Sequence, residues 1–182
     1  MRSGSNPGPF LWDLKMSDEQ TLRFYAEHAR TYAARGAGAT EPRLQDFIAA
    51  LPPGAHVLEL GTGGGHHAAH TLAQGLVVDA TDASPDLASE AEKRIGRPVA
   101  IMRFDQLTAS GIYDGVWASA ALLHAPAGEL TDDLARIHNA LRPGGPVRFQ
   151  LQGGVGRGAR RLWPLLQLSR CHHAGAAFSG GR

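Results

Sequence analysis

The most informative segment of the sequence is HVLELGTGGGHHAAH, residues 56–70. It begins with an apolar run that ends in Glu59 and Leu60, and glycine then occupies every second position from 61 to 65. Glycine has no Cβ and reaches backbone conformations closed to other residues, so a glycine-rich loop can pass close to a ligand. The stretch therefore predicts a short buried strand, a loop that faces a ligand, and the start of a helix.

Strand-like and helix-like patterns alternate on either side of this loop. Further strands are expected within 75–82, 98–104, 113–123 and 146–151. Helices are expected within 17–35, 41–51, 66–73, 85–95 and 129–141, where apolar residues recur at helical spacing or a capping signal begins the run. Alternation of this kind predicts an α/β fold, a Rossmann-like doubly wound parallel sheet. Such sheets bind ligands at the carboxyl ends of their strands, near the switch point.

Length and composition predict a single domain in a reducing compartment. The chain has 182 residues, of which 43% are hydrophobic, and it contains one cysteine, Cys171. We find no apolar run of the ~20 residues that cross a bilayer, and no secretory signal at the start of the sequence. We expect a cytoplasmic protein with a flexible extension over 1–15, a folded domain over 16–151, and an irregular basic tail over 152–182.

The loop favours one class of nucleotide ligand over another. A dinucleotide loop has the spacing G-x-G-x-x-G, but here the third glycine position is occupied by His66. Glu59, two residues before the first glycine, would repel a pyrophosphate and suits a ligand with a cationic end. A NAD(P)-dependent oxidoreductase is therefore the less favoured alternative, and an ordinary strand–helix turn also stays open.

Carboxylates follow the next two strands. Asp82 ends the second strand, where a carboxylate can accept hydrogen bonds from both ribose hydroxyls of an adenosine. The third strand ends in Phe104 and Asp105, whose ring and carboxylate suit the face and the exocyclic amine of adenine. The alternative is structural, with Asp82 capping the following helix and Asp105 beginning a turn.

Five motifs in order and spacing resemble the class I S-adenosylmethionine-dependent methyltransferases. They are VLELGTGGG, VDATDASPDL, FDQL, YDGVWASAALLH and ALRPGG, and the resemblance covers residues 17–146. The likeness is greatest to the small bacterial type grouped with tellurite-resistance methyltransferases. It implies in-line transfer of a methyl group from S-adenosylmethionine to a small-molecule acceptor.

The resemblance also assigns residues to roles. The methionine part and sulfonium of the cofactor would face a set from the first strand and its loop: Glu59, Gly61, Thr62, Gly63 and Gly65. The adenosine part would lie against Asp82, Ala83, Phe104 and Asp105, and the methyl-transfer mouth against Ala118 and Ser119. The N-terminal helix would close over the cofactor through Tyr25 and Tyr32, which are equally well read as core aromatics.

Histidines raise two further possibilities. His124 follows the fourth strand, near the expected acceptor, and is read either as a base or orienting group or as a packing residue. His66 and His70 lie at i, i+4 on a helix, yet no carboxylate on that helix completes a metal site, so we expect no metal.

The C-terminal segment departs from the family. Residues 147–182 carry six arginines and no acidic residue, and the 31 residues after Leu151 show none of the two-strand pattern expected next. One hypothesis is a frameshift, because LWPLLQLS can be encoded so that the adjacent frame reads FGRYYNYP. A basic tail that binds nucleic acid is the less favoured alternative. A non-catalytic methyltransferase-like module also stays open.

Overall fold

The computed structural model describes residues 18–34, 42–119, 121–122 and 128–150. The helices are α1 (Asp18–Ala34), α2 (Pro42–Ala49), α3 (His66–Ala73), α4 (Pro85–Ile95) and α5 (Leu130–Ala140), with a 3-10 turn η2 (Phe104–Gln106). The strands are β1 (His56–Leu60), β2 (Val77–Asp82), β3 (Ala100–Ile101), β4 (Gly115–Ser119) and β5 (Val147–Gln150).

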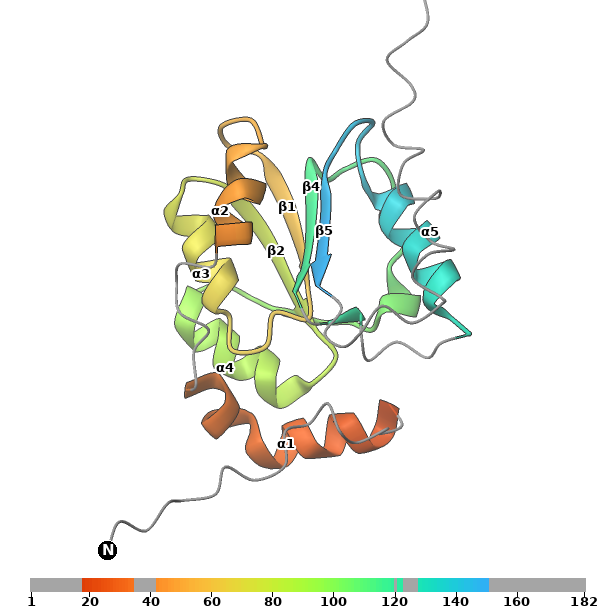
Figure 1. Ribbon diagram of the computed structural model, residues 1–182. Helices are drawn as coiled ribbons and strands as arrows, with labels where there is room; N and C mark the ends of the chain where they lie inside the picture. The colour runs from red at the N-terminus through yellow and green to blue at the C-terminus, as the bar shows by residue number, and fades with distance from the viewer. Residues whose placement is uncertain (1–17, 35–41, 120, 123–127, 151–182) are drawn as a thin grey trace, which may run out of the picture.

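The five strands form one parallel sheet in the order β3-β2-β1-β4-β5 (Figure 1). Leu58, in the middle of β1, is paired with Asp79 of β2 on one side and Val116 of β4 on the other. The chain therefore leaves β1 in one direction for β2 and β3, and then crosses back to β4 and β5. This confirms the predicted doubly wound sheet and places its switch point between β1 and β4.

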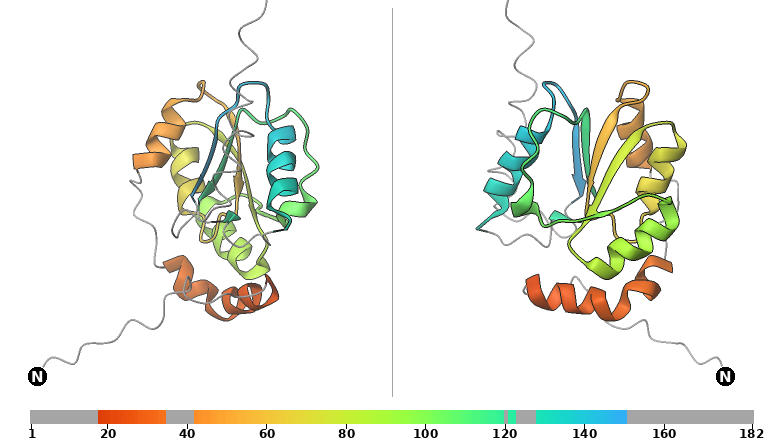
Figure 2. Two further views of the ribbon diagram at one scale, coloured as in Figure 1. Left: turned by 45° about the vertical axis from the view of Figure 1, so that its right-hand side comes forward. Right: turned by 180° about the vertical axis from the view of Figure 1, so that it is seen from behind.

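Helices cover both faces of the sheet, and α1 lies beyond its carboxyl edge. Figures 1 and 2 show α2, α3 and α4 on one face and α5 on the other, with α1 crossing below the strand tips. The core on the α5 side is built around Leu58, Val116 and Ile137. The opposite core holds Phe47 and Trp117, whose ring centroids lie 5.3 Å apart. Ligand chemistry is therefore expected on the edge that α1 crosses.

Local signals set the bounds of α4 correctly. Ser84 is its N-cap, with the side-chain oxygen accepting from the Leu87 amide at 3.4 Å, and Pro85 follows in the first turn. Gly96 ends the helix in the left-handed conformation with φ 65°.

The third strand is shorter than the sequence pattern predicts. It covers two residues, whereas 98–104 were expected to be extended. The Arg103 amide donates to Gln106 Oε1 at 2.8 Å, and this bond bends the chain into η2. The pairing with β2 stops at Ile101, which lies opposite Asp82 at the end of that strand. The apolar pattern over 98–104 did not predict the turn, whereas the alternative in which Asp105 begins a turn agrees with η2.

None of the helices in the described ranges combines the length and the hydrophobicity that spanning a bilayer requires.

Candidate functional site

The glycine loop begins where β1 ends, next to the switch point. Gly61, Gly63 and Gly65 have φ of 68°, 57° and 75°, a region that favours glycine strongly. The Thr62 amide donates to the Thr81 carbonyl at 2.8 Å, which ties the loop to β2. A Cβ on Gly61 would lie 2.5 Å from the Cβ of Ala121, so this position also requires glycine for space.

The same loop is wedged between two helices. A Cβ on Gly64 would lie 2.8 Å from Ala33 Cα in α1, and one on Gly65 would lie 3.0 Å from Ala91 Cα in α4. The sequence analysis did not single out Gly64. The unbroken run of glycines from 63 to 65 was the signal that could have identified it. Glycine is required at position 64 because α1 packs against it, and the sequence does not show that contact.

Glu59 is the first of two buried carboxylates at this edge. It is 3% exposed, and the Thr62 hydroxyl donates to its Oε1 at 2.9 Å. Burial raises the pKa of Glu59 to about 8, with Thr62 acting to lower it and the charge of Asp82 acting to raise it. Glu59 is therefore largely neutral in the free protein at pH 7, and a nearby cation would favour its ionised form.

Asp82 is the second carboxylate and fastens the loop to β2. Its Oδ2 accepts from the Gly63 amide at 2.8 Å, and its Oδ1 accepts from the Ser84 amide at 2.9 Å. It is 7% exposed, and burial raises its pKa while these backbone bonds act to lower it. The helix cap itself is made by Ser84, so the capping alternative for Asp82 is only partly right: Asp82 holds the cap residue and the loop together.

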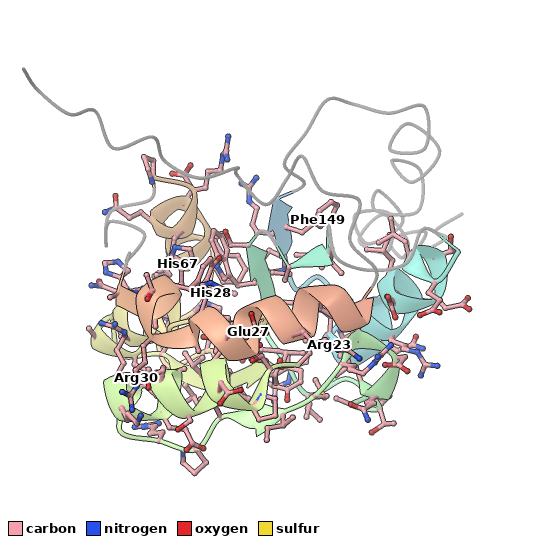
Figure 3. The ribbon with its side chains drawn as sticks, turned by 90° about the horizontal axis from the view of Figure 1, so that it is seen from below. Arg23, Glu27, His28, Arg30, His67 and Phe149 are labelled. Atoms are coloured by element: carbon pink, nitrogen blue, oxygen red, sulfur yellow. The ribbon has the colours of Figure 1, made fainter. Side chains whose placement is uncertain are left out.

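α1 lies across this edge. Figure 3 views it from below, with Arg23, Glu27, His28 and Arg30 labelled along the helix. Tyr32 is 39% exposed, and a Cβ on Gly63 would lie 3.5 Å from its Cε1. Tyr32 therefore lies against the loop rather than in a core. The side chain of Tyr25 lies outside the part of the chain that the structure describes.

The remaining predicted residues have varied surroundings. Phe104 is half-buried and packs against the core on the α5 side, whereas Asp105 is exposed and pairs with Arg103 Nε at 3.2 Å. Ala118 is fully buried in that same core, and Ala83 and Ser119 are half-buried. His124 lies outside the described residues.

The histidines of α3 have structural contacts. His66 Nε2 lies 2.8 Å from the Ala33 carbonyl oxygen, and the Trp117 indole donates to His67 Nδ1 at 3.1 Å. Among the residues that the structure describes, no three His, Cys, Asp or Glu side chains are grouped so that they could hold a metal ion.

The donor set fits a ligand with a cationic end and a sugar. Two buried carboxylates stand at adjacent strand tips, and in the described part of the chain their partners are a hydroxyl and backbone amides. The glycines leave space where side chains would stand. The residues present therefore fit S-adenosylmethionine, which carries a sulfonium, an ammonium and a ribose.

Comparisons with known proteins agree with this geometry. Residues 57–145 match the model of a methyltransferase domain family. No curated protein sequence matches the chain. A 1,6-didemethyltoxoflavin N1-methyltransferase from Burkholderia thailandensis, solved with S-adenosylhomocysteine, is 23% identical over 86% of this chain and 80% of that one, with a TM-score of 0.64.

Two further solved structures are similar. A TehB-like S-adenosylmethionine-dependent methyltransferase from Corynebacterium glutamicum is 25% identical over 82% of each chain, with a TM-score of 0.61. The N-methyltransferase NodS from Bradyrhizobium japonicum, bound to S-adenosylhomocysteine, is 16% identical over 74% of this chain and 72% of that one, with a TM-score of 0.60. The fold, the family match and the donor set agree, and the protein is a class I S-adenosylmethionine-dependent methyltransferase.

Proposed function

We propose that Glu59, the loop from 61 to 65 and Asp82 bind S-adenosylmethionine, and that the acceptor of the methyl group is a small organic molecule. The observation that carries the proposal is the pair of buried carboxylates at the tips of β1 and β2, held by amides and a hydroxyl in the described part of the chain. A bound cation would favour the ionised form of Glu59, and the carboxyl oxygens can accept further hydrogen bonds from a ligand.

Glu59 supplies the attraction for the cationic end. Burial disfavours its ionised form in the free protein, and a bound cation offsets that cost. Binding therefore couples to loss of the Glu59 proton. Thr62 orients the carboxyl, and because its hydroxyl donates more strongly to the ionised form, it assists the loss of the proton.

Asp82 supplies acceptors for the ribose. A carboxylate has roughly four acceptor positions, so Asp82 can hold backbone amides and still accept from a hydroxyl. Because the Gly63 amide is bound to the same group, the ribose and the loop are held in fixed relation. That relation sets where the reactive end of the cofactor lies.

The acceptor side rests on α1 and on the segment after β4. S-adenosylmethionine supplies an electrophilic methyl group, and its transfer needs a nucleophile held in line with water excluded. α1 crosses the carboxyl edge and covers the loop through Tyr32. His124 follows the fourth strand in the sequence, and we expect it to act near the acceptor as a base or an orienting group. The Burkholderia relative was solved with 1,6-didemethyltoxoflavin, which supports a small organic acceptor here.

A ligand-dependent unfolding scan tests the cofactor part. The full chain is heated alone, with S-adenosylhomocysteine, and with NADH as the matched nucleotide control. A ligand that binds the folded protein, at a free concentration a hundred times its dissociation constant, adds about 2.7 kcal/mol to the free energy of unfolding. We expect a rise with S-adenosylhomocysteine alone. A rise with NADH and none with S-adenosylhomocysteine would refute the proposal.

The acceptor part needs a turnover assay. Release of S-adenosylhomocysteine is measured against a panel of small nitrogen, oxygen and sulfur nucleophiles, and then repeated with His124→Gln. Loss of a general base lowers kcat by about 10²- to 10⁴-fold, and S-adenosylhomocysteine binding should not change. An unaltered kcat would remove His124 from the proposal.

A further inference from the structure

The C-terminal end of α1 is fastened by side chains from elsewhere in the chain. The last carbonyls of a helix have no partner within that helix. The Ala33 carbonyl accepts from Arg94 Nη2 at 3.1 Å, and His66 Nε2 lies 2.8 Å from the same oxygen. Since a carbonyl only accepts, Nε2 carries the proton in this contact. These donors come from α4 and α3, and so they fix where α1 ends.

Arg94 also holds the glycine loop. Its Nε donates to the Gly64 carbonyl at 2.6 Å, so one guanidinium joins the loop to α1. The planar fork of arginine presents several donors in fixed directions, whereas a lysine ammonium acts as a single point. Two carbonyls from segments 31 residues apart are thereby held at a set separation. Arg94 lies in the last turn of α4, and the sequence alone did not single it out.

The two acceptors of Arg94 each adjoin a residue of the proposed cofactor site. Gly64 follows Gly63, whose amide is bound to Asp82. Ala33 follows Tyr32, whose ring lies against Gly63. Gly64 and Ala33 are also packed so closely that a Cβ on Gly64 would not fit between them. A displacement of α1 at this end therefore moves the loop, and a displacement of the loop moves α1.

The ion pair that the structure records between α1 and α4 is weaker than the Arg94 bridge. Arg30 Nε lies 3.8 Å from Glu90 Oε1, and the Arg30 side chain is 89% exposed. Exposed ion pairs of that length add little stability. Ala29 and Ala33 are buried but offer little surface. The guanidinium bridge is thus a directional contact, and with two acceptors it joins the end of α1 to the glycine loop.

We propose that Arg94 is a positioning residue that makes the docking of α1 and the cofactor-ready shape of the loop a single event. The proposal rests on the proposed function of the loop. Arg94 touches neither cofactor nor acceptor; it acts through Gly64 and Ala33. Binding at the loop then favours the docked α1, and docking favours binding by the same factor.

The first test measures S-adenosylhomocysteine affinity by calorimetry for Arg94→Ala, Arg94→Lys and a control, Arg97→Ala. Arg97 is exposed and two residues after α4, so its variant removes the same charge without the bridge. Hydrogen bonds from a charged donor are strong, and we expect the dissociation constant of Arg94→Ala to rise about tenfold or more. The dissociation constant of Arg94→Lys should lie between those of the wild type and Arg94→Ala. That of Arg97→Ala should stay within about twofold of the wild type.

A second readout separates positioning from general stability. Hydrogen exchange of the amides at 29–34 is followed with and without S-adenosylhomocysteine. In the wild type the ligand should slow this exchange, and in Arg94→Ala it should not, even where the variant is saturated with ligand. Equal protection in both proteins would overturn the proposal.

A second pair of variants keeps the test decisive if Arg94→Ala fails to fold. Gly64→Ala leaves Arg94 intact but pushes on Ala33, whereas Gly128→Ala adds the same methyl group where nothing lies within 4 Å. Gly64→Ala should weaken S-adenosylhomocysteine binding and abolish the α1 protection, and Gly128→Ala should do neither. If wild type binds no S-adenosylhomocysteine, the proposed function fails. If wild type binds and both Arg94→Ala and Gly64→Ala bind equally well, the inference alone fails.

Discussion

The two ends of the sheet treat their carboxylates in opposite ways. At the amino end, Asp79 Oδ2 lies 2.9 Å from His56 Nε2 and accepts from the Tyr113 hydroxyl at 3.0 Å. Asp114 accepts from Arg142 Nη1 at 2.6 Å and from the His56 amide at 2.8 Å. The His56 amide and then Arg142 hold the pKa of Asp114 below its ordinary value. Asp114 therefore has partners that favour its charge, and Asp79 has two side-chain partners within hydrogen-bond distance.

At the carboxyl end the balance is reversed. Glu59 and Asp82 are both more deeply buried, and burial is the largest influence on each, raising both pKa values. The partners that the described residues offer them are amides and one hydroxyl. One end of the sheet is electrostatically complete without a ligand, and the other is not. Acids of the second kind are the better guide to a binding site.

The largest effect should come from the loop itself. In Gly61→Ala the new methyl group meets Ala121, and alanine is strained at φ 68°. Gly111→Ala is the matched control, since Gly111 has φ 63° and nothing within 4 Å of its Cβ position. Strain should cost both about 1–2 kcal/mol, and overpacking should add about 1–3 kcal/mol in Gly61→Ala alone. Urea unfolding and S-adenosylhomocysteine titration measure both terms; equal losses would mean that space at Gly61 is irrelevant.

Asp82→Asn should come next. An asparagine turns an NH₂ group toward one of the two backbone amides that Asp82 now binds, so the loop and the ligand lose an anchor together. We expect S-adenosylhomocysteine to bind about 10- to 100-fold more weakly. Asp86→Asn, an exposed acid in the first turn of α4, removes an equal charge outside the site. Should the two variants bind alike, net charge rather than the Asp82 position would explain the effect.

Glu59→Gln should have its main effect on how stability and S-adenosylmethionine affinity vary with pH, and a smaller effect on the affinity at any one pH. Folding raises the Glu59 pKa from 4.5 to about 8, so the folded state holds the proton more tightly. Its contribution to stability is present below pH 4.5 and is lost as the pH rises toward 8. Affinity for S-adenosylmethionine should move the other way and increase between pH 6 and 8. Stability and affinity are measured against pH for the wild type and for Glu59→Gln, and the difference between the two proteins gives the contribution of Glu59 to each. If the curves of the two proteins are parallel, Glu59 does not titrate in this range and the prediction is wrong.

The smallest effect should lie at the amino end. Arg142→Ala removes a half-exposed partner of Asp114, and exposed ion pairs contribute about 0–1 kcal/mol. The Asp114 contribution is present above the unfolded pKa of 3.8 and is lost as the pH falls through the lower pKa of the folded state. Urea unfolding should therefore show the loss of stability at pH 7 and still at pH 4, and no loss once Asp114 is protonated in the folded state, with S-adenosylhomocysteine affinity unchanged. A large loss of affinity would erase the contrast between the two ends.

Sequence reasoning succeeded where the signal is local. Ser84, Pro85 and Gly96 bound α4 through their own backbone preferences, and the glycines at 61, 63 and 65 have the positive φ that their pattern predicted. The positions of Glu59 and Asp82 were predictable because parallel strands bring their tips to one edge. The assignment of cofactor contacts to Phe104, Asp105 and Ala118 stays a prediction.

Sequence reasoning missed contacts that depend on how distant helices cross. Gly64 and Arg94 carry no sequence pattern of their own, and their importance appears only in the structure, where each contacts the other and both contact Ala33. The length of β3 was predicted wrongly for a different reason: a local hydrogen bond from the Arg103 amide to the Gln106 side chain ends the extended segment.

The bond between Arg94 and Ala33 spans 61 residues, and this separation has a consequence for synthesis. When α1 leaves the ribosome, neither the loop nor α4 has been made, and a lone helix of 17 residues is only marginally stable in water. The helix stays a fluctuating segment until residue 94 has emerged, so α1 is fixed only after β1, α3, β2 and α4 have been made. In a nascent chain arrested before that point α1 would not be docked. We therefore expect this helix to be accessible to chaperones and proteases during translation.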